Sequence, residues 1–208
     1  MPRTKGSRDR AFAEKRNALI GLARALLSSP AGRNASWREI AAACSVSVST
    51  MNHYFADRGS LVAAIVELAE SEGAPYLAMT REPSGPFAQS IADLVFMIAQ
   101  GFTHGVLALQ VIGLGEGFSA PGAAKAYLGH HLEPVLGAIA TRLERHVALG
   151  EMVDTDVRFA AIALLSPLLV AHLHQSSLGG SQSHPMSLAD FGTHHAAAFV
   201  RAYRTENA

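Results

Sequence analysis

Residues 36–61 read SWREIAAACSVSVSTMNHYFADRGSL, and this stretch decides the fold. Ser36 can cap the free backbone amides at the start of a helix while Glu39 reaches back to the cap, which is the capping-box pattern. This helix should end near Cys44, and a second short helix should begin at Ser47, whose hydroxyl favours the N-cap position. Two short helices separated by about three residues predict a helix-turn-helix.

The second helix of this motif carries small polar side chains on its outer face. Such a slim face can enter the DNA major groove, which is about 12 Å wide. Serine and threonine can donate or accept hydrogen bonds there, asparagine can form a bidentate pair with adenine, and valine can contact a thymine methyl group. The residues expected on this face are Val48, Ser49, Thr50, Asn52 and His53.

The formal net charge of zero hides an uneven distribution along the chain. Residues 1–60 contain ten lysines and arginines and four acidic residues, which gives them a net charge of +6 and leaves −6 for the remainder. An anionic partner for the N-terminal part is one explanation, and a solubilising surface is the other.

The rest of the chain predicts helices and few strands. Apolar side chains recur at helical spacing over residues 9–27, and a further helix starts near residues 57–60. The glycines and prolines of residues 72–86 predict a break. Five later helical stretches are expected, with bounds of 87–109, 110–117, 121–149, 154–177 and 185–204.

Two stretches of the later chain have simple interpretations. Gly113-x-Gly115-x-Gly117 follows no strand and lacks the full dinucleotide-binding spacing, so it is interpreted as a helix break. The most apolar stretch, residues 159–173, is shorter than the roughly 20 residues that span a bilayer. We therefore expect it to be a buried core helix, and we expect no membrane association.

The motif resembles the helix-turn-helix of the TetR family of bacterial transcriptional regulators. The similarity includes the Ile-Ala pair at residues 40–41, the turn at residues 44–47, the aromatic pair at residues 54–55 and Leu61. It extends over about residues 10–70, and beyond them only the length and the helical pattern agree.

The resemblance implies an all-α protein with two domains. Residues 1–60 would form a three-helix DNA-binding domain, and residues 61–208 would form a domain for effector binding and dimerisation, with the fourth helix joining the two. The protein would be a cytoplasmic homodimer and a sequence-specific transcriptional regulator without a cofactor. As a repressor, it would leave its double-stranded DNA operator when a small hydrophobic effector binds.

The resemblance also implies roles for residues within the motif. Those expected to position the DNA backbone are Arg38, Ser47, Thr50, His53, Tyr54 and Arg58, and those nearer the bases are Val48, Ser49 and Asn52. Ser45 stands where the family has a turn glycine, often with positive φ, so a small energetic cost is expected. Asn52 replaces a tyrosine that contacts phosphate in the family, and Tyr54 is expected to take over that contact.

The C-terminal part is expected to hold a mostly apolar effector pocket with few polar groups. Its expected lining consists of Leu68, Phe96, Met97, Phe102, His104, Leu109, Phe118, His131, Leu165, Leu169 and His172, which could equally be ordinary core. By resemblance, dimers would form through the helices at residues 154–177 and 185–204. The apolar stripe expected in the first of these helices consists of Val157, Ala161, Leu164, Leu165 and Leu168, and Leu188 belongs to the stripe of the second. Either stripe could equally be intramolecular core, and the dimer is favoured because paired half-sites need a dimer.

The ten histidines support an alternative function, a helical enzyme or a metal-binding protein. The neighbouring pairs, His130-His131 and His194-His195, diverge by about 100° on a helix, and none of the close sets has the i, i+4 spacing that places two imidazoles on one face. A third interpretation is a helical dimer whose motif binds protein. The single cysteine, Cys44, excludes a disulfide within the chain and fits a reducing cytoplasm.

Overall fold

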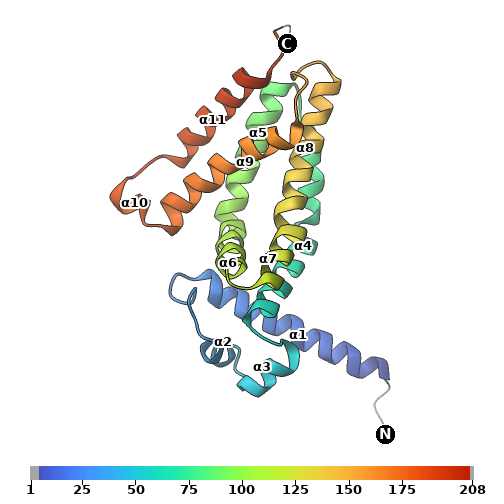
Figure 1. The fold of residues 1–208 in the computed structure, drawn as a ribbon, viewed down its shortest axis with the longest axis vertical. Coiled ribbons are helices and arrows are strands. Elements are labelled where there is room, and N and C mark those ends of the chain that lie inside the picture. Colours follow the sequence, from blue (N-terminus) through green and yellow to red (C-terminus); the bar gives the residue numbers. More distant parts are fainter. Residues whose placement is uncertain (1–4, 207–208) are drawn as a thin grey trace. The chain divides into compact units, whose positions relative to one another are not determined.

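The chain is built from α-helices (Figure 1). The computed structural model describes residues 5–206, with side chains from residue 9, and no strand occurs in this part. The helices are α1 (Lys5–Ser28), α2 (Trp37–Ala43), α3 (Val48–Tyr54), α4 (Arg58–Arg81), α5 (Phe87–Gly101), α6 (Leu107–Gly117), α7 (Pro121–Tyr127), α8 (Glu133–Ala148), α9 (Val157–His172), α10 (Gly180–Ser183) and α11 (Leu188–Tyr203). Short π-helical turns follow α7 and α9, at Leu128–Leu132 and Leu173–Ser177, and a kinked segment, Phe102–Val106, joins α5 to α6. The all-α prediction is therefore confirmed.

The helices form two compact units, each with its own core. Unit 1 comprises the described part of Met1–Ala69 together with Ala108–Tyr127, and unit 2 comprises Glu70–Leu107 and the described part of Leu128–Ala208. Buried side chains from α1 to α4 and from α6 and α7 fill the core of unit 1; they include Leu19, Ile40, Met51, Leu61, Ile65, Leu109, Ile112 and Ala123. Helices α6 and α7 thus complete the unit that contains the helix-turn-helix, while the functional division at residue 60 stays a prediction.

Local capping explains where the short helices of unit 1 begin. The Ser36 hydroxyl accepts a hydrogen bond from the Glu39 amide at 3.3 Å, and the Glu39 carboxylate accepts one from the Ser36 amide at 2.7 Å. Ser47 caps α3 by accepting from the Thr50 amide at 3.0 Å. Between the helices Ser45 has a φ of 55°, so the predicted left-handed turn is present with a serine in it.

Helix α4 is longer than predicted, because the break expected at residues 72–86 is confined to the residues after Arg81. Pro75 lies inside the helix, where it removes one backbone hydrogen bond. The end of the helix is held instead by the buried Arg142, whose guanidinium donates to the carbonyl oxygens of Thr80 and Met79 at 2.8 Å each. This tertiary cap stabilises the last turn despite the proline.

Gly113 and Gly115 do not interrupt α6, which ends at Gly117, so the predicted break falls only at the last glycine of this run. Gly113 lies within α6, and a Cβ atom there would overlap the ring of Tyr127. The glycine therefore allows α6 and α7 to pack closely. The chain also bends earlier, at His104 and Gly105, where Gly105 has a φ of 105°.

The expected dimerisation stripe of α9 is instead part of the core of unit 2. Ala161, Leu164 and Leu168 are fully buried there, together with residues of α5, α8 and α11. The exposed face of α9 carries Phe159 and Val170, which are 69% and 63% exposed. The stripe prediction is wrong because several faces of this helix are apolar, and spacing alone does not tell which one faces inward.

Two helical stretches, Phe87–Gly117 and Val157–Ser177, are long and apolar enough to cross a membrane by length and composition. The second stretch extends beyond residues 159–173, the most apolar segment of the sequence, at both ends. Its Leu164 and Leu168 are fully buried in the core of unit 2, as in the core helix of a folded domain.

Candidate nucleic-acid interface

Helix α3 lies on the surface of unit 1 and is anchored by one side chain. Met51 is its only fully buried residue and packs among α1, α2 and α4. Ser49, Asn52 and His53 are exposed, as a helix that enters a groove requires. Val48 is half-buried against the core of unit 1, so it offers only part of its surface to a thymine methyl group.

The first turn of α3 is fixed by hydrogen bonds between its own hydroxyls. The Ser47 and Thr50 hydroxyl oxygens lie 2.9 Å apart, in addition to the cap that Ser47 forms on the Thr50 amide. Hydroxyls and amides at a helix start can bind a phosphate oxygen. Ser47 and Thr50, to which the resemblance assigns contacts with the DNA backbone, thus lie together at the start of α3.

An aromatic cluster joins α1 to the end of α3. The ring of Phe12 stacks on Tyr54 with centroids 4.7 Å apart, and the edge of His53 meets Phe12 at 5.6 Å. The guanidinium of Arg16 lies 5.3 Å from the centre of the Phe55 ring. Phe12 was not predicted to belong to this surface, and its helical spacing in the sequence indicates only an apolar position.

Asn52 is held by a residue of the neighbouring helix. The indole N–H of Trp37 donates a hydrogen bond to Oδ1 of Asn52 at 2.8 Å. This pair could not be predicted from the sequence, because the two residues are 15 positions apart and lie in different helices. Arg38, next to Trp37, is exposed, and a residue that contacts the DNA backbone would have to lie on the surface.

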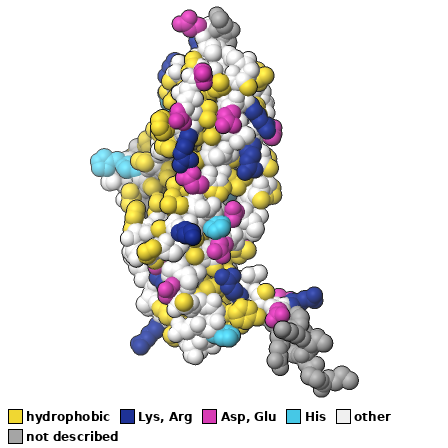
Figure 2. All heavy atoms as spheres, turned by 45° about the vertical axis from the view of Figure 1, so that its right-hand side comes forward, with side chains coloured by type: hydrophobic (Ala, Val, Ile, Leu, Met, Phe, Trp, Pro, Cys, Tyr) yellow, Lys and Arg dark blue, Asp and Glu magenta, His cyan; other side chains and the backbone are white. Residues whose placement is uncertain are grey.

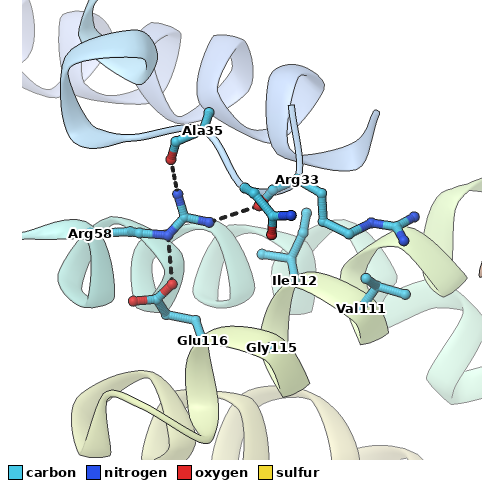
Figure 3. Close-up of a pocket in the computed structure, with 8 residues that line it drawn as sticks. Arg33, Ala35, Arg58, Val111, Ile112, Gly115 and Glu116 are labelled. Carbon is cyan, nitrogen blue, oxygen red and sulfur yellow. Dashed lines mark hydrogen bonds and ion pairs between the residues drawn. The ribbon is translucent and has the colours of Figure 1, made fainter. Parts of the chain in front are cut away.

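Arg58 is directed away from the expected phosphate contact (Figure 3). Its Nε donates to the Glu116 carboxylate at 2.7 Å, and its two terminal nitrogens donate to the carbonyl oxygens of Ala35 and Arg33. The side chain of Arg58 is 29% exposed and that of Glu116 is 15% exposed. The structure thus corrects the prediction for Arg58, because its donors stabilise the packing of the α1–α2 loop and α6 within unit 1.

Beside this ion pair lies a cavity of about 450 Å³ within unit 1. It is lined by Arg33, Asn34, Ala35, Arg58, Val111, Ile112, Gly115 and Glu116. None of the residues predicted for an effector pocket lines it. Glu116 lies in the glycine-rich run, where nothing in the local sequence indicates a partner 58 positions away.

The residues predicted to line one effector pocket are divided between the two units. Leu68 and Leu109 belong to the core of unit 1, while Phe102, Leu165, Met97 and Leu169 belong to that of unit 2. Phe96 and Phe118 are 66% and 86% exposed, so neither lines an enclosed pocket of this chain and both predictions are corrected. Apolar spacing cannot distinguish such surface positions from core or pocket.

The three histidines predicted for the pocket have different surroundings. His172 is buried against Phe102, with ring centroids 4.9 Å apart, and its Nδ1 lies 2.8 Å from the Leu168 carbonyl oxygen. His104 is exposed, with its Nδ1 2.7 Å from the Gln100 carbonyl oxygen. Burial lowers the pKa of His131 to about 4, so its imidazole is neutral at pH 7. Of the residues predicted to line the pocket, Phe102 and His172 thus lie in direct ring contact.

Charged side chains of both signs are interspersed on the molecular face drawn in Figure 2. Among the described residues, no three histidine, cysteine, aspartate or glutamate side chains lie close enough together to hold a metal ion. Cys44 is buried, and this burial raises the pKa of its thiol.

Comparison with known proteins identifies the fold. No protein-family model and no curated protein matches the chain. Among solved structures, a TetR transcription regulator from Haloarcula marismortui has a TM-score of 0.71 at 10% identity, with 93% of this chain and 100% of the other covered. SmeT, the repressor of a Stenotrophomonas maltophilia multidrug efflux pump, has a TM-score of 0.62 at 18% identity, covering 92% and 91%. RolR in complex with resorcinol has a TM-score of 0.61 at 18% identity, covering 94% and 90%. The chain has the fold of the TetR-family transcriptional regulators.

Proposed function

We propose that this protein is a sequence-specific DNA-binding transcriptional regulator that acts as a repressor in the cytoplasm. The observation that carries the proposal is α3, a short helix with exposed polar side chains that is anchored in unit 1 through Met51. Ser47, Thr50, His53, Tyr54 and Arg38 would position the DNA backbone. Ser49 and Asn52 would face the bases, with Val48 at the edge of the contact.

The repressor would bind its operator as a homodimer. One α3 reads few base pairs, and a two-fold dimer doubles the site by placing two such helices about 34 Å apart. The exposed apolar face of α9, with Phe159, Ile162 and Val170, would be covered by a second copy of the chain. Helix α11 adds small exposed side chains, such as Ala197 and Ala198, that allow close helix packing.

A small, mostly apolar effector would release the operator. SmeT, which has this fold, is a repressor. RolR, which has the same fold, binds resorcinol, a small aromatic compound. In the present chain the Phe102–His172 pair in unit 2 offers an aromatic surface beside one buried imidazole. Such a ligand would favour one conformation of the dimer over another and thereby change the affinity for DNA.

Selection of binding sites from random duplex DNA tests the proposal directly. The protein should enrich a two-fold symmetric sequence. Ser49→Glu, which places a negative charge on the exposed first turn of α3, should abolish enrichment, because the carboxylate would enter the major groove and be repelled by the phosphates on both sides of it. Ser181→Glu is the matched control, since Ser181 is an exposed serine in the first turn of α10, and it should bind as the unmodified protein does. Failure of the unmodified protein to enrich any sequence, at low or high salt, would refute the proposal.

A further inference from the structure

The hydrogen bond between Trp37 and Asn52 determines which atoms of the Asn52 side chain are available to a partner. An indole N–H can only donate a hydrogen bond, so the amide atom that faces it at 2.8 Å must be the oxygen. The two ends of an asparagine amide are otherwise nearly identical in shape. Trp37 therefore fixes the polarity of the Asn52 side chain and leaves the NH₂ group at its other end.

The two residues differ in how firmly they are held. Trp37 is the first residue of α2 and packs, half-buried, against the core of unit 1. Asn52 is exposed on α3 and has no other hydrogen-bond partner among the described residues. An exposed amide would normally exchange between rotamers, and the anchored indole restricts this exchange before any partner binds.

We propose that Trp37 is a specificity-determining residue that acts through Asn52. The inference rests on the proposed function, because it requires α3 to enter the major groove. A bidentate pair with adenine uses the amide oxygen as an acceptor and the amide nitrogen as a donor. The bond from Trp37 occupies one of the two lone pairs of the Asn52 oxygen, and it leaves the second lone pair and the N–H donors available for such a pair in a single orientation of the amide.

The proposal predicts a change of base preference when the indole N–H is removed. Trp37→Phe keeps an aromatic ring at the start of α2 but has no donor, so the Asn52 amide can rotate and present its NH₂ group to guanine as well. At the base pair that Asn52 contacts, the unmodified protein should prefer adenine, and Trp37→Phe should discriminate less between adenine and guanine. We expect a change of about tenfold in the ratio of the two affinities. Binding to non-specific DNA should change less than twofold, since phosphate contacts carry it.

Site selection with four proteins tests the mechanism: the unmodified chain, Trp37→Phe, Asn52→Ala and the double variant. In the Asn52→Ala background, Trp37→Phe should leave the selected sequence unchanged, because its effect passes through the amide. A change of preference that persists without Asn52 would show that Trp37 acts through packing, and would overturn the proposal. The same conclusion follows if Trp37→Phe prefers adenine at this position as strongly as the unmodified protein does.

A measurement on the DNA-free protein separates this inference from the proposed function. Trp37 is the only tryptophan, so its indole N–H gives a single side-chain NMR signal. Asn52→Ala should move that signal upfield and speed its exchange with solvent, and an unchanged signal would overturn the inference. If the signal moves but the unmodified protein enriches no DNA sequence, the hydrogen bond stands, the proposed function fails, and the role in specificity is overturned with it.

Discussion

Replacing Arg58 with alanine should destabilise unit 1 by about 3 kcal/mol. The charge-assisted hydrogen bond to Glu116 at 2.7 Å is worth roughly 1.5–3 kcal/mol, and each carbonyl group that loses its donor adds about 1 kcal/mol. The 29% exposure of Arg58 allows water to replace part of these contacts, which brings the total to about 2–4 kcal/mol. Glu116 is only 15% exposed and would be left as an unpaired carboxylate.

Urea unfolding followed by tryptophan fluorescence reports the unfolding of unit 1, because Trp37, the only tryptophan, lies in that unit. Arg38→Ala is the matched control, since Arg38 is an exposed arginine of the same unit and its loss should cost less than about 0.5 kcal/mol. Binding to the selected duplex adds a second comparison. The slope of log binding constant against log salt concentration counts the ions released on binding. Arg38→Ala should reduce this slope by about one ion, while Arg58→Ala should leave it unchanged.

The opposite pattern would refute this reasoning. If Arg58→Ala costs less than about 0.5 kcal/mol and lowers the salt dependence by about one ion, the guanidinium contacts phosphate, as the resemblance implies. Replacing both partners, as in Arg58→Met with Glu116→Met, should recover much of the stability that Arg58→Ala loses. Two apolar side chains leave no charge unpaired.

Other predictions follow from single features of the two units. Ser45→Gly should stabilise unit 1 by about 0.5 kcal/mol in urea unfolding, because glycine adopts a φ of 55° without strain; a loss of stability would show that the serine is not strained. Arg142→Met should destabilise unit 2 by about 3 kcal/mol in calorimetry, since the buried guanidinium donates to carbonyl groups at the end of α4 and to Ser90; an unchanged transition would contradict this cap. The folded-state pKa of His131, about 4, lies below the ordinary value of 6.5, so its contribution to stability is full above pH 6.5 and is lost as pH falls toward 4. His131→Gln should show a weaker decline over that range in urea titrations, and an identical decline would exclude His131 as its source. Phe159→Glu on the exposed face of α9 should shift sedimentation from dimer to monomer, whereas Ser181→Glu at an exposed position of α10 should not.

Features that depend on neighbouring residues could be predicted from the sequence. The capping box of Ser36 and Glu39 and the N-cap at Ser47 each involve residues within four positions of one another. Their hydrogen bonds form wherever the local backbone adopts a helix start or a tight turn. The order of the helices therefore followed from spacing and caps.

Features that depend on distant residues could not be predicted. The length of α4 beyond Pro75 depends on Arg142, and the direction of the Arg58 side chain depends on Glu116. Any of several acidic residues could have been the partner of Arg58, and sequence spacing does not choose among them. The same limit applies to Phe96, whose apolar character is compatible with core, pocket or surface.

The discontinuous construction of unit 1 constrains how the chain can fold during synthesis. The residues from α1 to Ala69 emerge first, yet Leu109, Ile112 and Ala123 of the same core follow some forty residues later. Until they arrive, part of the apolar surface of α1 and α4 is open to water and to other chains. A nascent chain would therefore acquire the finished surface around α3 only after α7 has left the ribosome. By the same reasoning, residues 1–60 cannot be transplanted to another protein as an independent cassette without exposing that surface.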